Sequence, residues 1–151
     1  METKIKRFNE LNINELYEIL KLRVDVFVVE QNCPYKEVDG LDQAAVHVWL
    51  EENGEILAYL RVVDRGIESE HVSIGRVVTS IRREGLGTTV LKKGIEAAKK
   101  FFKADNVYLA AQTYAVSFYE KQGFKVISDE FMIDGIPHVK MLREDNDSQQ
   151  T

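Results

Sequence analysis

"VSIGRVVTSIRREGLGTTV", from Val72 to Val90, contains the signals of three successive structural elements. Its first eight residues, Val72 to Thr79, form a β-type apolar run. A short turn then brings together two arginines and two glycines, and a long amphipathic segment follows. From about Gly87 the apolar residues recur at helical spacing, and lysines dominate the opposite side. The stretch therefore predicts a strand, a glycine-rich turn and a helix in direct succession.

The turn has the composition of an anion site. Backbone N–H groups lack partners at a helix N-terminus, and the helix dipole attracts negative charge there. Gly85 and Gly87 have no Cβ, so the backbone can approach a phosphate closely. Arg82 and Arg83 add positive charge to a chain whose formal net charge is -5. Two glycines at such a turn are nevertheless more often simple turn chemistry, and nearby arginines are more often a solvated edge.

The chain before this stretch predicts a strand, a helix and a hairpin. We expect a strand over 3–8 and a helix that Asn12 and Glu15 cap and that runs to about Glu30. A loop follows over 31–43. Asn53-Gly54, between two β-rich runs, predicts a tight hairpin because a type I′ turn needs two residues with positive φ.

The chain after it predicts a mixed sheet. The run 106–112 is almost entirely apolar, as in a central strand, and 115–122 is a short helix ended by Gly123. Two last strands, 124–127 and 138–142, are expected around an Asp134-Gly135 turn. The order β-α-β-β-β-α-β-α-β-β places the fold in the α/β or α+β class.

Composition favours one soluble enzyme-sized domain. The 151 residues are 44% hydrophobic and 30% charged, and we expect one domain over 1–143 with a disordered polar tail over 144–151. The acidic balance argues against nucleic-acid binding, and no apolar run reaches the roughly 20 residues of a membrane span. The single cysteine, Cys33, cannot form an internal disulfide, which suits the cytoplasm. No metal site is expected, because the three histidines have no partners at ligand spacing.

Two motifs resemble the GCN5-related N-acetyltransferase (GNAT) family. Arg82-x-x-Gly85-x-Gly87 matches its [QR]-x-x-G-x-[GA] signature, with either Arg82 or Arg83 at the arginine position. The segment "AVSFYEKQGF" resembles the family's A-x-x-F-Y-E-K-x-G-F ending. Four further segments are similar to its ElaA-like branch: 22–42, 74–78, 108–112 and 134–141.

The resemblance implies a largely antiparallel mixed sheet in which two parallel strands, 72–79 and 106–112, splay apart to admit acetyl-CoA. The acetyl group would pass directly to an amine through a tetrahedral intermediate, whose oxyanion a backbone N–H stabilises. Tyr119 would act as the general acid on the departing thiolate. The residues implied to bind the cofactor are Val77, Val78, Thr79, Arg82, Arg83, Glu84, Gly85, Leu86, Gly87, Thr88, Gln112 and Ser117.

The acceptor side offers several candidates for a base. They lie in the loop and strands that the family places near the acceptor: Glu30, Glu37, Asp39, Asp42, His47 and His138. Glu30 and His47 are the first choices, as base or as acceptor-site residues. Acidic loops often serve solubility alone, and either histidine could equally be a core residue. Together, the acids of 30–42 favour a cationic amine.

Other readings of the same residues remain open. A non-catalytic CoA-binding regulatory module would keep the fold and the turn but lose turnover. A phosphate or nucleotide binder without acyl chemistry would accept adenine nucleotides as well as CoA. The acceptor is expected to be a small-molecule or peptide amine rather than a nucleic acid or a membrane, and the chain a monomer or homodimer.

Overall fold

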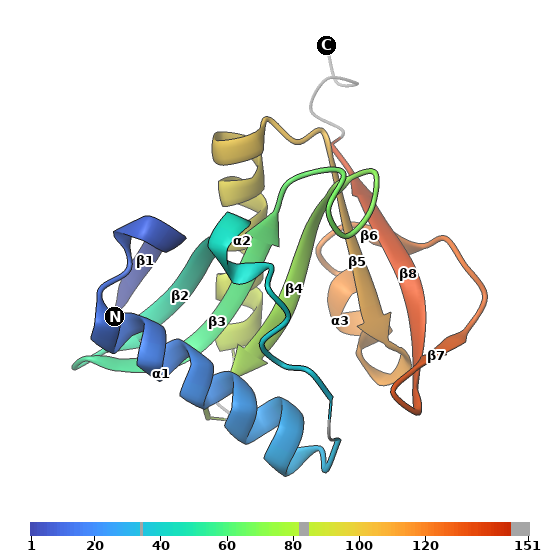
Figure 1. The fold of residues 1–151 in the computed structure, drawn as a ribbon. Coiled ribbons are helices and arrows are strands. Elements are labelled where there is room, and N and C mark those ends of the chain that lie inside the picture. The colour runs from blue at the N-terminus through green and yellow to red at the C-terminus, as the bar shows by residue number, and fades with distance from the viewer. Residues whose placement is uncertain (34, 82–84, 146–151) are drawn as a thin grey trace.

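The computed structural model describes residues 1–33, 35–81 and 85–145 of the chain. Over these residues one sheet of eight strands carries three α-helices (Figure 1). The strands are β1 Glu2–Arg7, β2 Val46–Glu52, β3 Glu55–Val63, β4 Val72–Thr79, β5 Asn106–Gln112, β6 Phe124–Val126, β7 Phe131–Ile133 and β8 Ile136–Glu144. The helices are α1 Ile13–Arg23, α2 Leu86–Phe102 and α3 Val116–Glu120.

The sheet runs in the order β1-β2-β3-β4-β5-β8-β6, and β7 also pairs with β8. Every pair is antiparallel except β4 and β5. These two parallel strands pair only at their beginnings, through Val72 with Val107 and Ser73 with Tyr108. Beyond that point they separate, as Figure 1 shows at their carboxyl ends. The predicted fold class is confirmed, including the splayed parallel pair.

The helices cover opposite faces of the sheet (Figure 1). Helix α1 packs on one face, where Ile19 joins the buried side chains Trp49, Tyr59 and Val78. Helices α2 and α3 pack on the other face against the larger hydrophobic core. Gly94 lets α2 lie close to that face, since a Cβ there would lie 2.7 Å from the side chain of Leu60.

Local sequence signals account for several element boundaries. Glu15 N–H donates to Asn12 Oδ1 (2.7 Å) and Asn12 N–H to Glu15 Oε1 (3.0 Å), so the predicted capping box starts α1. Asn53 and Gly54 both have positive φ and turn the β2–β3 hairpin as expected. The helix does extend to Glu30, but its last part, Val24–Glu30, is a π-helix, which the sequence did not predict.

A β-bulge in β4 changes which side chains face which helix. Opposite β3, the register shifts between Tyr59 and Arg61, and Arg76 adopts a left-handed φ of 55°. Before the bulge, Val72 and Ile74 pack in the core on the α2 side. Without it Val78 would share that face, but Val78 packs on the α1 side instead. The bulge therefore reorients the part of β4 that faces β5 across the gap.

The carboxyl-terminal part needs two corrections. Three strands rather than two follow α3, and the Asp134-Gly135 turn joins β7 to β8, not the strand at 124–127. The short run 131–133 lacked a recognisable alternation of its own. The ordered sheet also passes the expected boundary at 143, because β8 includes Glu144 and Asp145 N–H donates to Asp105 O (2.8 Å). The rest of the predicted tail lies outside the described residues.

Among the described helices, none has the length and hydropathy of a membrane span.

Candidate active site

A cavity of about 1180 Å³ opens where β4 and β5 separate. Its wall includes Val77, Val78 and Thr79 from β4, and Gln112 from the end of β5. Tyr119 of α3 reaches the same space. Five residues predicted at separate places in the sequence thus line one cavity. Glu30, Asp39 and His138, three of the candidate bases, also line it.

Tyr119 is held by aromatic neighbours. Its ring meets the edges of Phe118 (centroids 5.0 Å apart) and Phe124 (5.9 Å), and the three rings pack against the main core. Burial, with a smaller contribution from Tyr114, raises the pKa of the phenol above its usual value. Tyr119 therefore keeps its proton at neutral pH and can offer it at the cavity wall as a hydrogen-bond donor.

The amino end of α2 has the geometry expected of the glycine-rich turn. Gly85 precedes the helix with a left-handed φ of 88°, and the first helical bond runs from Thr89 N–H to Gly85 O (2.9 Å). The N–H groups of Leu86, Gly87 and Thr88 consequently have no acceptor within the helix. Gly87 has a second role, since a Cβ there would lie 3.2 Å from the ring of Phe118.

Other predicted cofactor residues are placed differently. The side chain of Leu86 is buried in the core, so only its backbone could meet a ligand. Ser117 is exposed at the start of α3. Neither of these residues, nor Gly85, Gly87 or Thr88, lines the cavity. Arg82, Arg83 and Glu84 lie outside the described residues.

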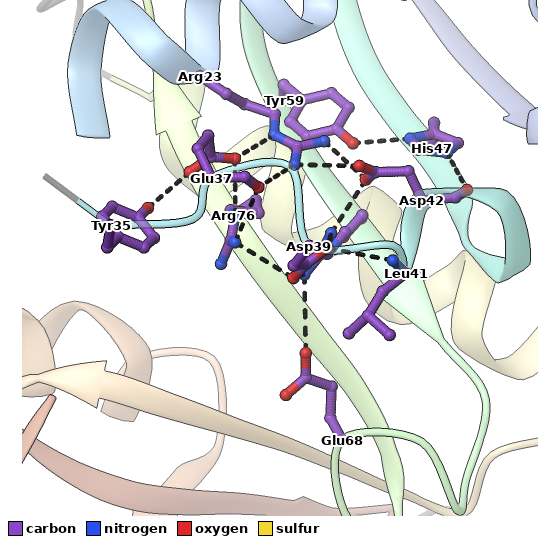
Figure 2. Close-up of polar contacts among 11 residues, drawn as sticks. Arg23, Tyr35, Glu37, Asp39, Leu41, Asp42, His47, Tyr59, Glu68 and Arg76 are labelled. Carbon is purple, nitrogen blue, oxygen red and sulfur yellow. Dashed lines mark hydrogen bonds and ion pairs between the residues drawn. The ribbon is translucent and has the colours of Figure 1, made fainter. Parts of the chain in front are cut away.

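At the cavity wall, Arg23, Arg61 and Arg76 form a largely buried network with Glu37, Asp39 and Asp42, and Arg61 also pairs with the more exposed Glu68 (Figure 2). Arg23 donates from Nε to Glu37 Oε2 (2.6 Å) and from Nη1 to Asp42 Oδ1 (2.7 Å). Arg61 donates from Nη2 to Asp39 Oδ2 (2.5 Å) and from Nη1 to Asp42 Oδ1 (3.0 Å). The network ties α1 and β3 to the loop between α1 and β2.

The third arginine, Arg76, connects the bulge of β4 to this loop. Its Nε donates to Glu37 Oε2 (2.8 Å) and its Nη2 to Asp39 Oδ2 (3.2 Å). The guanidinium lies 5.5 Å from the ring centroid of Tyr35, whose hydroxyl donates to Glu37 Oε1 (2.5 Å). The unusual backbone of Arg76 is thereby held by contacts at the far end of its side chain.

These contacts remove three candidates from the list of bases. Glu37 and Asp42 are 4% and 5% exposed, and arginines occupy their carboxylates. Burial alone would raise the pKa of Asp39, but its hydrogen bonds to Arg61 and Leu41 N–H and the positive charges around it lower it to about 2. Three arginines also balance the three acids. The loop therefore brings less net negative charge to the acceptor side than its composition predicted.

His47 does not lie where it was expected. Its side chain is fully buried and is absent from the cavity wall. One ring nitrogen, Nδ1, pairs with Tyr59 Oη (2.7 Å), and Nε2 pairs with Asp42 O (3.0 Å). Burial lowers the pKa of the imidazole, and the nearby arginines add to this against the opposing effect of Asp42. His47 is therefore a core residue of the network rather than a group that meets an acceptor.

Sequence reasoning missed the arginines and Tyr59 in this network. A signal was present for each arginine. Arg23 lies four residues after buried Ile19 on α1, and Arg61 and Arg76 interrupt apolar strand runs. A long charged side chain on a buried face requires a partner, so these positions could have predicted buried ion pairs.

His138 does reach the cavity. It is 9% exposed and stands opposite Gln112 in the β5–β8 register. Its Nδ1 lies 2.7 Å from Ile136 O, and its ring is tilted against Phe131, with centroids 6.2 Å apart. No described group of three His, Cys, Asp or Glu side chains could hold a metal ion.

Comparison with known proteins identifies relatives that cover most of the chain. The family model of the acetyltransferase (GNAT) domain matches residues 17–144. Protein ElaA of Escherichia coli is 39% identical over 140 residues, which are 90% of this chain and 92% of ElaA. The crystal structure of Escherichia coli ElaA superposes with a TM-score of 0.88 at 37% identity, covering 95% of this chain and 99% of that one. A structure titled acyl-CoA N-acyltransferase, from Pseudomonas aeruginosa, gives a TM-score of 0.89 at 39% identity over the same shares of the two chains.

Proposed function

Because the chain belongs to the GNAT acetyltransferase family and is similar to ElaA, we propose that it is an N-acetyltransferase that moves an acetyl group from acetyl-CoA to a primary amine. The observation that carries the proposal is the cavity between the splayed strands β4 and β5. Val77, Val78 and Thr79 of β4 line that cavity, and so does Tyr119 of α3. A nucleophile and an acyl donor could meet there.

The described residues fit coenzyme A in two respects. The gap between β4 and β5 can take a long, thin chain, because the strands stop pairing after Ser73 and Tyr108. The amino end of α2 offers the N–H groups of Leu86, Gly87 and Thr88 to a diphosphate. Acetyl-CoA, when bound, supplies the activated acyl group.

Residues of this chain would stabilise the developing negative charge and supply a proton to the leaving sulfur. A backbone N–H in 77–79 would donate to the carbonyl oxygen as negative charge develops on it, an interaction worth about 3 kcal/mol in enzymes where one such donor was removed. Tyr119 would give its proton to the departing sulfur. The raised pKa keeps the phenol protonated at neutral pH, so its proton is present to be donated or hydrogen-bonded to that sulfur.

The acceptor would be a small-molecule or peptide amine that enters from the α1 side. Glu30 lines that part of the cavity from the π-helix and is the carboxylate we propose to face the ammonium group. We also propose that the protein acts in the cytoplasm as a monomer or homodimer and does not bind nucleic acid.

Thiol release from acetyl-CoA tests this proposal. The wild-type chain is assayed against simple primary amines, polyamines, amino sugars and lysine peptides, and turnover with at least one class is expected. Tight CoA binding without turnover on any of them would favour the regulatory module instead. Calorimetry with acetyl-CoA, CoA and ATP tests whether the chain is instead a phosphate or nucleotide binder without acyl chemistry. Such a protein would bind ATP as well as CoA.

A further inference from the structure

An acceptor amine must lose a proton before it can attack, and we propose that His138 is the general base that takes it. This inference rests on the acetyl transfer proposed above. Of the chain's three histidines, all within the described residues, His138 alone lines the cavity. His47 is enclosed in the arginine network, and His71 lies at a separate shallow pocket beside Asn106.

The hydrogen bond at Nδ1 decides which ring nitrogen is available. Ile136 O can only accept, so at 2.7 Å it requires the proton on His138 Nδ1. The neutral ring then carries its lone pair on Nε2. A carbonyl that fixes the tautomer in this way prepares the imidazole to accept a proton at the other nitrogen.

Nε2 also remains accessible. The described residues make no hydrogen bond to Nε2. Among these residues, every side-chain nitrogen or oxygen that is fully buried does have a hydrogen-bond partner. Nε2 is therefore not sealed in the core. Because His138 lines the cavity, we infer that Nε2 faces this space and would meet a ligand there. Phe131 packs on the ring and limits its rotation.

The base, His138, and the acid, Tyr119, then act from opposite faces of the sheet. Along β8, Val139 and Met141 pack in the core on the α2 side, so His138 and Lys140, which alternate with them, point to the opposite face of the sheet. Tyr119 packs against the α2-side core. An amine arriving over the α1 face would meet Nε2, whereas a sulfur leaving on the other side would meet the phenol.

The proton balance of the reaction needs both groups. The ammonium form of the acceptor gives a proton to Nε2, which releases it to solvent. The neutral nitrogen bonds to the thioester carbonyl carbon, the C–S bond breaks, and the electron pair leaves on sulfur. Sulfur takes the Tyr119 proton, the nitrogen gives its second proton to Nε2, which releases it to solvent, and Tyr119 regains one proton from solvent. In sum, an ammonium ion and a thioester become an amide, a thiol and one released proton.

His138→Asn is the variant that isolates Nε2. Its amide can still donate to Ile136 O, but it has no group at the Nε2 position. With an amine accepted by the wild type, we expect kcat to fall by about 10²–10⁴-fold while CoA binding measured by calorimetry stays the same. His71→Asn is the matched control and should keep wild-type kcat. His138→Gln repeats the measurement if the Asn variant does not fold, as judged by its thermal melt.

A second nucleophile distinguishes proton transfer from simple positioning. Hydroxylamine is largely uncharged at neutral pH, so its attack does not require a base to the same degree. We expect the loss in His138→Asn to be much smaller with hydroxylamine than with the ammonium-forming amine. An equal loss with both nucleophiles, unchanged kcat in both His138 variants, or a comparable loss in Glu30→Gln alone would overturn the assignment. Absence of any wild-type turnover would instead overturn the acetyl transfer on which it rests.

Discussion

His47 on β2 and His138 on β8 have nearly the same burial, 0% and 9% exposed, yet they belong to different kinds of region. Both nitrogens of His47 have partners within the protein, Tyr59 and the backbone of Asp42. His138 uses only Nδ1 in this way. The first ring completes a closed network, and the second leaves one nitrogen at the wall of a cavity.

The difference shows that burial alone does not separate a structural polar residue from a functional one. Around His47, Arg23, Arg61 and Arg76 pair with the carboxylates of Glu37, Asp39 and Asp42, and Arg61 also pairs with Glu68. These ion pairs stabilise the arrangement of α1, β3 and the loop, although Asp39, Arg61 and Arg76 also line the cavity. Around His138 the same level of burial holds the ring in place while one polar atom stays open.

The largest expected effect in this comparison is on the network. Arg23→Met leaves the buried carboxylates of Glu37 and Asp42 without their main partner, so we expect the free energy of unfolding to fall by about 3–5 kcal/mol. Urea denaturation measures it. Lys21→Met, an exposed position on the same helix, is the control and should change stability by less than about 0.5 kcal/mol. A loss below about 1 kcal/mol in Arg23→Met would show that the network is not closed as described.

The next effect is on turnover at the cavity. Tyr119→Phe keeps the contacts with Phe118 and Phe124 but removes the proton donor, so kcat should fall by at least about 10²-fold with little change in stability. Tyr17→Phe, on the exposed side of α1, is the control. Full turnover in Tyr119→Phe would leave the departing sulfur without the acid proposed for it.

How far the sequence predicted these regions depends on the distance between the interacting residues. The Asn12 cap and the Asn53-Gly54 turn involve neighbours in the chain, and both were predicted correctly. Tyr119 was singled out by its resemblance to a motif. The bonds from the arginines to Glu37, Asp39 and Asp42 join residues 14 to 39 positions apart, so these pairs could not be read from local spacing. For His47, no local pattern tells whether both ring nitrogens will find partners, and its expected place at the acceptor site was wrong.

His47→Leu tests whether His47 has only a structural role in the arginine network. The change leaves the Tyr59 hydroxyl and the Asp42 carbonyl without a buried partner, which should cost about 1–3 kcal/mol of stability in urea denaturation. The folded fraction should keep wild-type kcat, in contrast to His138→Asn. If the folded His47→Leu protein lost turnover as completely as the His138 variant, the distinction between the two regions would fail.

Acid should weaken the network in two stages, with a smaller effect than these substitutions. The pKa of His47 lies below the ordinary value of 6.5, so below that pH the unfolded chain binds more protons and stability falls. The pKa values of Asp39, about 2, and Asp42 are lowered too, so their contribution is present above about pH 4 and is lost as pH falls toward 2. Urea denaturation across pH measures both stages. In His47→Leu the first stage should disappear and the second should remain; an unchanged first stage would assign it to another group.

The smallest effect concerns the turn before α2, where a matched pair of glycines is available. Gly85 and Gly66 have similar left-handed φ values, 88° and 86°, and a Cβ at either would meet nothing within 4 Å. Replacing either with alanine should therefore cost about 1 kcal/mol of stability through backbone strain alone. Only Gly85→Ala disturbs the N–H groups at the start of α2, so calorimetry should show weaker CoA binding in that variant and not in Gly66→Ala. If both variants bound CoA with equal affinity, the glycines of the turn would be needed only for the backbone conformation and for the close approach of Gly87 to Phe118. The diphosphate would then be held elsewhere.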